Sequence, residues 1–355
     1  MRFLLTGGIS NFTDRSYNAN RSRLGVFTTT DGLISALEEM GHTVTCKYVI
    51  PGEDLSMYDN LIVGLSSLFN NMALHTPGVY WALSKFKNPI LTVNDWRVLD
   101  AMKMVKADVN KNDNFFTTYV KSNNKQLSGA NKVEDYFKLV TENLDAIIEA
   151  KQWFDSAEHL PLLFPAYSGF NREKLKVNNP VFPWNPSEFM PQKSYVANSL
   201  FSEKEEVHLI ASTSTPKWSW FKNLDPAWTS LEEIEKNSAF KIQAFGNWNK
   251  NAVKEKELVS IMADATTCIV PSYSQIAGVG MWRPRHVICN NVDTLVLCDK
   301  EEGSFMGEGY GEHSAKEIEA MTESQREDLL EIQKESFKKS GLEKEGVFEQ
   351  INKVI

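Results

Sequence analysis

A carboxylate at the end of a predicted strand is the first candidate for chemistry. In the segment LTVNDWR (91–97), the β-prone residues Leu91, Thr92 and Val93 run directly into Asn94 and Asp95. Ligands of open α/β sheets bind outside the carboxyl ends of the strands, where a carboxylate can act as a general base. An aspartate at such a place can equally cap the turn that follows it. Asp95 is therefore a candidate base, with capping as the alternative.

The segment that follows Asp95 is basic and aromatic. Residues 101–133 contain six lysines and two aspartates, a net charge of +4, with three aromatic residues among them. Lysines bind phosphates and aromatic rings stack on bases, so we predict an insert that faces nucleic acid. Its expected contacts are Arg97, Lys103, Lys106, Lys111, Phe115, Phe116, Lys121 and Lys125. A solvated loop whose rings pack on the domain is the alternative, and Arg97 could instead orient Asp95 or form a surface ion pair.

Composition describes a globular protein of two ordinary domains. The 355 residues are 42% hydrophobic and 24% charged, and their net charge is −8. Fifteen acidic and eight basic residues lie between 299 and 355, and they carry −7 of the net charge. The rest of the chain is therefore close to neutral, so an acidic total does not exclude a face that binds nucleic acid. The four cysteines have no zinc-site spacing. We expect a cytoplasmic protein, because no signal peptide or membrane span is visible.

The order of predicted elements is that of a doubly wound parallel sheet, twice over. In the first half, strands are expected at 2–6, 43–48, 61–65 and 88–95, with helices at 32–40 and 78–87. The proline-rich composition of residues 184–199 indicates a domain linker. The pattern then restarts, with strands expected at 206–212, 240–246, 265–272 and 293–299. Two such halves leave a cleft between them, the usual place for a ligand.

The domain boundaries follow from this pattern. We expect an N-terminal domain over 1–185, a second domain over 199–325 and a C-terminal helical segment over 326–355. Leu329, Leu330, Ile332 and Phe337 could pack one face of that segment. It could return to the first domain or lie solvated on the second.

Several stretches in the same order resemble the bacteriophage DNA β-glucosyltransferase family. YDNLIVGLSS (58–67) is similar to a strand of that family, and LTVNDWR resembles the next strand, which ends in Asp-x-Arg. EEMGHTV (38–44), AFGN (244–247) and RHVICNNVDTLVLCD (285–299) follow in the family's order. The resemblance covers roughly residues 1 to 300.

The resemblance implies a GT-B-like α/β fold, with two Rossmann-like domains and parallel doubly wound sheets facing an interdomain cleft. It also implies a transferase whose second domain binds a UDP-sugar and whose first domain receives DNA. Asp95 falls on the family's catalytic base, which takes a proton from the acceptor hydroxyl during direct displacement. A cytosine inside a duplex would have to flip out to reach the cleft.

The family's donor contacts map onto two loops of the second domain. In ASTSTPKW (211–218), Thr213 and Ser214 could present backbone N–H groups to the diphosphate, and Lys217 lies near a family arginine. The family's paired glycines are missing there, and an ordinary Ser/Thr turn is the alternative.

In GVGMWRPRHVI (278–288), either Arg283 or Arg285 matches the family's donor-binding arginine, depending on the direction of counting. The family's Arg-x-x-Glu lacks its glutamate here. His286 could replace it as a hydrogen-bonding group at the ribose, or could merely cap a helix.

Two further stretches carry expected donor contacts. Phe245, Gly246 and Asn247 would flank the uracil in the family's arrangement, although a strand-end turn explains the glycine as well. Asp31 lies near the family's acidic sugar contact if a two-residue offset is allowed, and as an N-cap it would need no function.

The function expected from sequence is transfer of a sugar from a UDP-sugar to the hydroxyl of 5-hydroxymethylcytosine in double-stranded DNA. Glucose is the family's best-known sugar, and the altered Arg-x-x-Glu motif leaves room for a pentose such as arabinose. The alternatives are a UDP-sugar transferase for a small molecule or polysaccharide, and a non-catalytic DNA- or nucleotide-binding protein. We expect a monomer without membrane contact, and the sequence does not decide whether Mg²⁺ or Mn²⁺ takes part.

Overall fold

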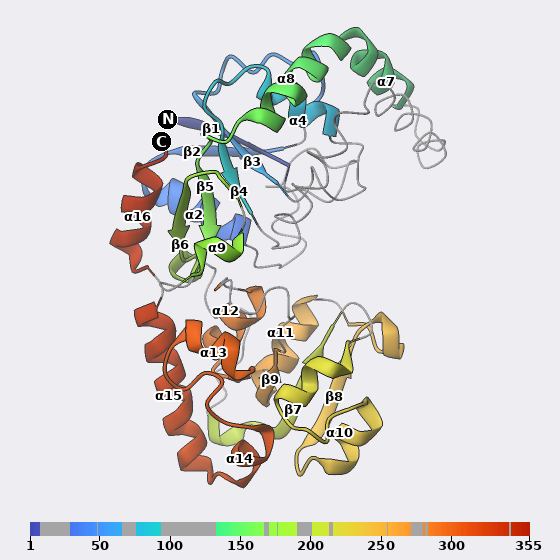
Figure 1. Cartoon of the computed structure of the whole chain (residues 1–355), viewed down its shortest axis with the longest axis vertical. Coiled ribbons are helices and arrows are strands. Elements are labelled where there is room, and N and C mark those ends of the chain that lie inside the picture. The colour runs from blue at the N-terminus through green and yellow to red at the C-terminus, as the bar shows by residue number, and fades with distance from the viewer. Residues whose placement is uncertain are drawn as a thin grey trace.

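The computed structural model shows two α/β units joined in one chain (Figure 1). It describes residues 1–7, 29–47, 49–65, 76–93, 133–166, 170–175, 177–189, 201–212, 216–253, 255–270, 280, 283–340 and 342–355. Each unit contains one parallel sheet with helices on both faces, so the predicted architecture of two successive parallel sheets is confirmed.

The first sheet has six parallel strands within the described residues, in the order β2-β1-β3-β4-β5-β6. The strands are β1 (Arg2–Thr6), β2 (Thr43–Cys46), β3 (Asn60–Gly64), β4 (Ile90–Thr92), β5 (Leu162–Pro165) and β6 (Val181–Trp184). The order reverses direction at β1, where the chain crosses from β2 to β3. The carboxyl ends of β1 and β3 are neighbours at this switch point, and β4 lies beside them, which is where open α/β sheets bind ligands.

Helices cover both faces of the first sheet. They are α2 (Thr29–Glu39), α4 (Thr76–Leu83), α7 (Val133–Glu142), α8 (Leu144–Ser156) and the single turn α9 (Arg172–Leu175). Alternate residues of β1 enter different cores: Leu4 packs with α4 and α8, whereas Phe3 and Leu5 pack with α2. This alternation is why the first strand is apolar along its length.

The second sheet has four parallel strands within the described residues, in the order β10-β9-β7-β8. The strands are β7 (Glu205–Ala211), β8 (Lys241–Phe245), β9 (Ala265–Ile269) and β10 (Leu295–Leu297). One face is covered by α11 (Glu255–Asp264) and α12 (Pro284–Asn291). The other is covered by the 3₁₀ helix η5 (Trp218–Asn223), by α10 (Leu231–Asn237) and by α14 (Ala315–Ala320).

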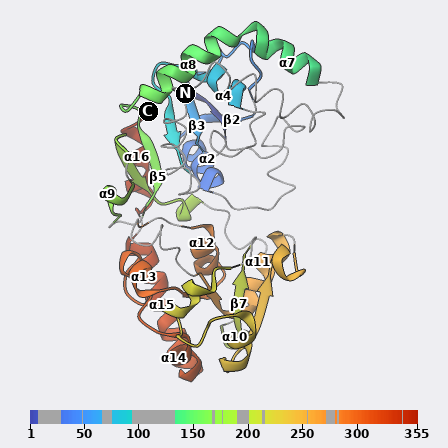
Figure 2. The same cartoon turned by 45° about the vertical axis from the view of Figure 1, so that its right-hand side comes forward.

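The C-terminal helices contact both units. Helix α15 (Glu323–Ser340) packs on the second sheet through Leu329 and Leu330, and Phe337 enters the other core of that unit. Helix α16 (Lys344–Asn352) places Val347 and Ile351 in the core that α2 and β1 form in the first unit. Figure 1 shows α16 beside β6, and both Figure 1 and Figure 2 show α15 in the second unit.

Three expectations about local structure need correction or addition. Ile332 is 39% exposed and does not pack inside as expected. Helix α2 begins at Thr29, so Asp31 lies within its first turn and is not the N-cap. The strands β5 and β6 were not predicted, although LLFP is fully buried and completes the sheet beyond β4. The predicted residue boundaries of the domains stay a prediction.

Candidate functional site

Many of the predicted site residues lie outside the described part of the chain. They are Asp95, Arg97, Lys103, Lys106, Lys111, Phe115, Phe116, Lys121, Lys125, Thr213 and Ser214. The site can therefore be built from the donor side, where Lys217, Phe245, Gly246, Asn247, Arg283, Arg285 and His286 are described.

A small pocket lies at the carboxyl ends of β7 and β8. Its volume is about 170 Å³, and it is lined by Ala211, Ser212, Phe245, Gly246, Ala252, Val253, Leu258 and Arg285. Of the predicted donor contacts, Phe245, Gly246 and Arg285 thus share one pocket. A nucleotide-sugar site is usually larger, so this pocket can hold only part of such a ligand. One cation among apolar walls suits a flat ring joined to an anionic group.

The backbone conformation and the close packing at residue 246, in the wall of the pocket, require a glycine. Its φ is +153°, and a Cβ atom there would lie 1.8 Å from the carbonyl oxygen of Ser212 and 2.5 Å from the indole nitrogen of Trp248. The turn is closed by a hydrogen bond of 2.9 Å from the Gly246 N–H to the carbonyl of Asn251. A side chain at residue 246 would push apart the two strand ends that form the pocket.

The two arginines that compete for one role occupy different environments. Arg285 lines the pocket. Arg283 is the N-cap residue of α12, and its side chain is 13% exposed. One terminal nitrogen of Arg283 lies 2.5 Å from Oε2 of Glu302 and donates to the carbonyl of Val270 at 3.2 Å. The guanidinium of Arg283 is therefore engaged inside the protein, whereas Arg285 is the arginine among the residues that line the pocket.

Glu302 connects this ion pair to His286. It lies in the first turn of α13 (Lys300–Met306), after β10, and its Oε1 is 3.6 Å from Nε2 of His286. Its side chain is 5% exposed and that of His286 is fully buried. Burial raises the pKa of the Glu302 carboxyl, and the charge of Arg283 opposes that rise. Burial and the two arginines hold the pKa of His286 well below 6.5, so this ring is neutral at pH 7.

His286 is fully buried in the structure. Its role as a hydrogen-bonding group at the ribose, in place of the family's glutamate, stays a prediction. Its contact is with Glu302, inside the domain. No signal in the linear sequence links Glu302 to the RPRH segment, nineteen residues earlier, because their proximity comes from the neighbouring carboxyl ends of β9 and β10.

The remaining predicted donor residues are placed as follows. Lys217 is exposed, and its ammonium lies 5.3 Å from the ring centre of Trp220; it is not among the described residues that line the pocket. Asn247 begins the 3₁₀ turn η6 (Asn247–Asn249), directly after Gly246. Asp31 is buried in the first turn of α2, and its contact with a sugar stays a prediction.

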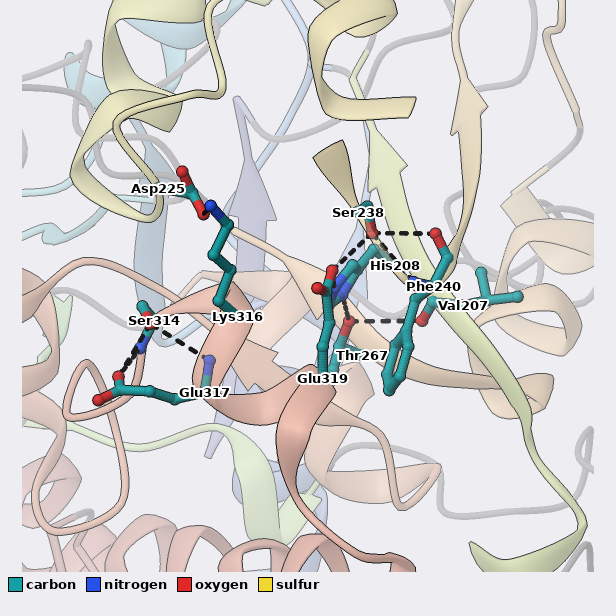
Figure 3. A network of polar contacts seen from close by, with 10 residues as sticks. All are labelled: Val207, His208, Asp225, Ser238, Phe240, Thr267, Ser314, Lys316, Glu317 and Glu319. Atoms are coloured by element: carbon teal, nitrogen blue, oxygen red, sulfur yellow. Dashed lines mark hydrogen bonds and ion pairs between the residues drawn. The ribbon is translucent and has the colours of Figure 1, made fainter. Parts of the chain in front are cut away.

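A second buried His–Glu contact lies toward the amino ends of the strands in the same unit. His208 of β7 is fully buried, with Nε2 3.0 Å from Oε1 of Glu319 and Nδ1 2.5 Å from the hydroxyl of Thr267. The Ser238 hydroxyl lies 2.6 Å from the same carboxylate oxygen. Figure 3 shows His208 between Glu319 and Thr267, with Phe240 alongside. This network ties α14 to the sheet and does not reach the pocket lining.

The described residues offer neither a metal cluster nor a membrane span. Within the described ranges, no group of three or more His, Cys, Asp or Glu side chains is placed to hold a metal ion. Among the helices that the structure describes, none combines the length and the apolarity needed to cross a membrane.

Comparisons with known proteins give a likeness in fold. No protein-family model and no curated protein matches the chain. A T4 phage β-glucosyltransferase variant in complex with UDP-glucose is similar over 100% of this chain and 99% of its own, with a TM-score of 0.59 and 13% identity. Two further structures of the T4 phage enzyme have the same coverage. One has a TM-score of 0.53 and 14% identity. The other, in complex with UDP-glucose, has a TM-score of 0.52 and 13% identity.

This likeness confirms the GT-B-like fold that the sequence predicts. It spans the whole chain, so both sheets and the C-terminal helices are included. At these identities the likeness concerns the fold alone, and the roles of individual residues must be argued from the site.

Proposed function

We propose that this protein is a DNA glycosyltransferase that transfers a sugar from a UDP-sugar to the hydroxyl of 5-hydroxymethylcytosine in DNA. The observation that carries the proposal is the full-length likeness in fold to T4 phage β-glucosyltransferase, which has been solved in complex with UDP-glucose. Another structure of this fold is that of the DNA modifying enzyme β-glucosyltransferase, with a TM-score of 0.53.

The donor binds at the carboxyl ends of the second sheet. Phe245 and Gly246 flank the uracil, and Arg285 neutralises the diphosphate, because it is the arginine that lines the pocket. Backbone N–H groups around Thr213 and Ser214, with Lys217, complete the phosphate contacts. The diphosphate gains charge as it leaves, so a fixed cation stabilises the transition state more than the bound donor.

Asp95 is the base that activates the acceptor. Its carboxylate removes the proton of the hydroxymethyl group while the hydroxyl oxygen forms a bond to the anomeric carbon of the sugar. The bond from that carbon to the diphosphate breaks at the same time, and UDP leaves with the electron pair. In the sequence Asp95 comes three residues after β4 ends at Thr92, and open α/β sheets bind ligands outside the carboxyl ends of their strands.

The basic insert of residues 101–133 holds the DNA. Its lysines contact phosphates, and Phe115 and Phe116 fill the space that the flipped cytosine leaves in the duplex. Charge reversal at Lys103, Lys106 and Lys111 would then weaken duplex binding and flatten its salt dependence. Affinity for UDP would stay the same.

The experiment is incubation of the protein with hydroxymethylcytosine DNA and a panel of UDP-sugars, including UDP-glucose and UDP-arabinose, followed by nucleoside mass spectrometry. A sugar-sized mass increase on hydroxymethylcytosine, and none on plain cytosine DNA, supports the proposal and identifies the sugar. Transfer to a small acceptor, or UDP-sugar hydrolysis with unmodified DNA, would contradict it.

The Asp95→Asn variant tests the base in the same assay. Asparagine keeps an oxygen that can cap a turn and removes the basicity. We expect UDP and DNA affinity to be retained, and single-turnover transfer to fall by on the order of 10²-fold or more. Transfer at the normal rate would show that Asp95 is not the base and would favour a structural role for it.

A further inference from the structure

We propose that Glu302 is a positioning residue for the donor site: through Arg283 and His286 it fixes the rotation of α12 that directs Arg285 into the pocket. The inference rests on the proposed function, since it assumes that the pocket binds a uridine diphosphate group. It adds a residue that lies on another element, α13, and does not line the pocket.

The contacts of Glu302 converge on one side of the start of α12. Arg283 and His286 are three residues apart, and residues at this spacing lie on the same face of a helix. A terminal nitrogen of Arg283 donates to Oε2 of Glu302 at 2.5 Å, and Nε2 of His286 lies 3.6 Å from Oε1, beyond hydrogen-bond distance. One carboxylate therefore bonds to the N-cap residue and packs against the first turn of the helix.

Arg285 leaves α12 in a different direction. Residues advance by about 100° each around a helix, so Arg285 points roughly 100° away from His286, the next residue of α12. A contact that fixes Arg283 and His286 toward α13 thereby fixes Arg285 toward β7 and β8, where the pocket lies. Pro284 at the first helical position restricts the backbone between them further.

Glu302 is itself held firmly. Its backbone N–H donates to the capping side chain of Asp299 at 3.1 Å. The next residue, Gly303, packs so closely on the Tyr310 backbone that a Cβ atom would lie 2.2 Å from its carbonyl oxygen. The first turn of α13 cannot shift without breaking this packing, so it provides a fixed reference for α12.

The charges agree with this arrangement, in which Arg283 pairs with Glu302 and Arg285 lines the pocket. The Glu302 carboxylate neutralises Arg283, and His286 is uncharged at pH 7 because burial lowers its pKa. Arg285 also belongs to this helix start, and it lines the pocket. An anionic ligand in the pocket would thus lie beside the positive charge of Arg285.

The test is a double-mutant cycle in which calorimetry measures UDP affinity. It compares the wild type, Glu302→Gln, Arg285→Ala and the double variant. If Glu302 acts through Arg285, Glu302→Gln weakens UDP binding on the order of tenfold in the wild type and changes it little in the Arg285→Ala background. Equal effects in both backgrounds would show that Glu302 acts independently of Arg285, and would overturn the inference.

The matched control is Glu319→Gln, which removes the charge from the other buried His–Glu contact of the same unit. It should destabilise the domain and leave UDP affinity within about twofold, because it is remote from the pocket. A loss of UDP affinity as large as that of Glu302→Gln would attribute both effects to general destabilisation, against the inference. If Glu302→Gln does not fold, Glu302→Asp, which keeps the charge and shortens its reach, takes its place in the cycle.

The two proposals fail differently. If Arg285→Ala weakens UDP binding and Glu302→Gln does not, the donor site stands and the positioning role is wrong. If the wild type does not bind UDP, both are wrong.

Discussion

Among its described residues, the second unit contains two buried contacts between a histidine and a glutamate, and they differ in what surrounds them. At the carboxyl ends of the strands, Glu302 shares its oxygens between His286 and the guanidinium of Arg283. Toward the amino ends, Glu319 receives His208 and the Ser238 hydroxyl (Figure 3). The first contact includes a permanent positive charge, whereas the second is completed by hydroxyl groups.

The proposed positioning role assigns the first contact to the donor site, whereas the second contact serves the fold. The hydroxyls of Thr267 and Ser238 satisfy the second network locally, and its members connect β7, β9 and α14. The first contact gathers charges next to a pocket, where burying them is costly. Such a cost is expected where the charges direct a ligand-binding group.

The largest predicted effect is on stability. Glu302→Gln leaves the buried charge of Arg283 without its counter-charge, so we expect the free energy of unfolding to fall by about 3–5 kcal/mol. Glu319→Gln removes a charged hydrogen-bond acceptor and should cost about 1.5–3 kcal/mol. Chemical denaturation monitored by tryptophan fluorescence measures both. A smaller loss for Glu302→Gln than for Glu319→Gln would reverse the comparison.

A pH dependence is the next largest effect. The folded-state pKa of His286 is held well below 6.5, so the unfolded chain binds a proton there more readily and stability falls as the pH drops below about 6.5. Between pH 6.5 and 5.5 this group contributes a loss of up to about 1 kcal/mol, because the unfolded chain is already half protonated there at pH 6.5. His286→Asn lacks that contribution, so its stability should fall less than that of the wild type across this interval. Parallel losses in the two proteins would show that His286 is not held neutral.

The smallest effect on stability is expected for an exposed ion pair, which serves as the reference for the two buried contacts. Lys241 and Glu205 lie on neighbouring strands near the His208 end of the sheet, with their charged atoms 3.6 Å apart and both side chains more than 60% exposed. Lys241→Ala should change the free energy of unfolding by less than about 1 kcal/mol, since water screens the pair. A larger loss would mean that charge at this end matters for the fold as much as the buried network does.

The fold could be predicted largely from periodicity. The strands at 2–6, 61–65 and 206–212 are apolar runs bounded by turn residues, and the structure places them within one residue of the expected ends. The strands β5 and β6 were missed because LLFP and VFPW are short and contain proline, which argues against a strand when the sequence is read alone. Their place at and next to the edge of the sheet is a tertiary property.

The site could be predicted only in part. Phe245, Gly246 and Arg285 were named from the sequence and share one pocket. Sequence left Arg283 and Arg285 as alternatives, and in the structure Glu302 reaches Arg283 from another helix. Local pattern cannot show such a contact, nor could it show that His286 is enclosed.

The most direct test of this account is hydrogen exchange with and without saturating UDP, followed at the peptide level. The account predicts slower exchange in residues 244–253 and in α12 with its N-cap, residues 283–291. It predicts unchanged exchange in α14 with its N-cap, residues 314–320, beside the His208 network. Protection of α14 that equals or exceeds that of α12, or UDP binding without any protection of 283–291, would contradict the assignment of the donor site to the carboxyl ends of the second sheet.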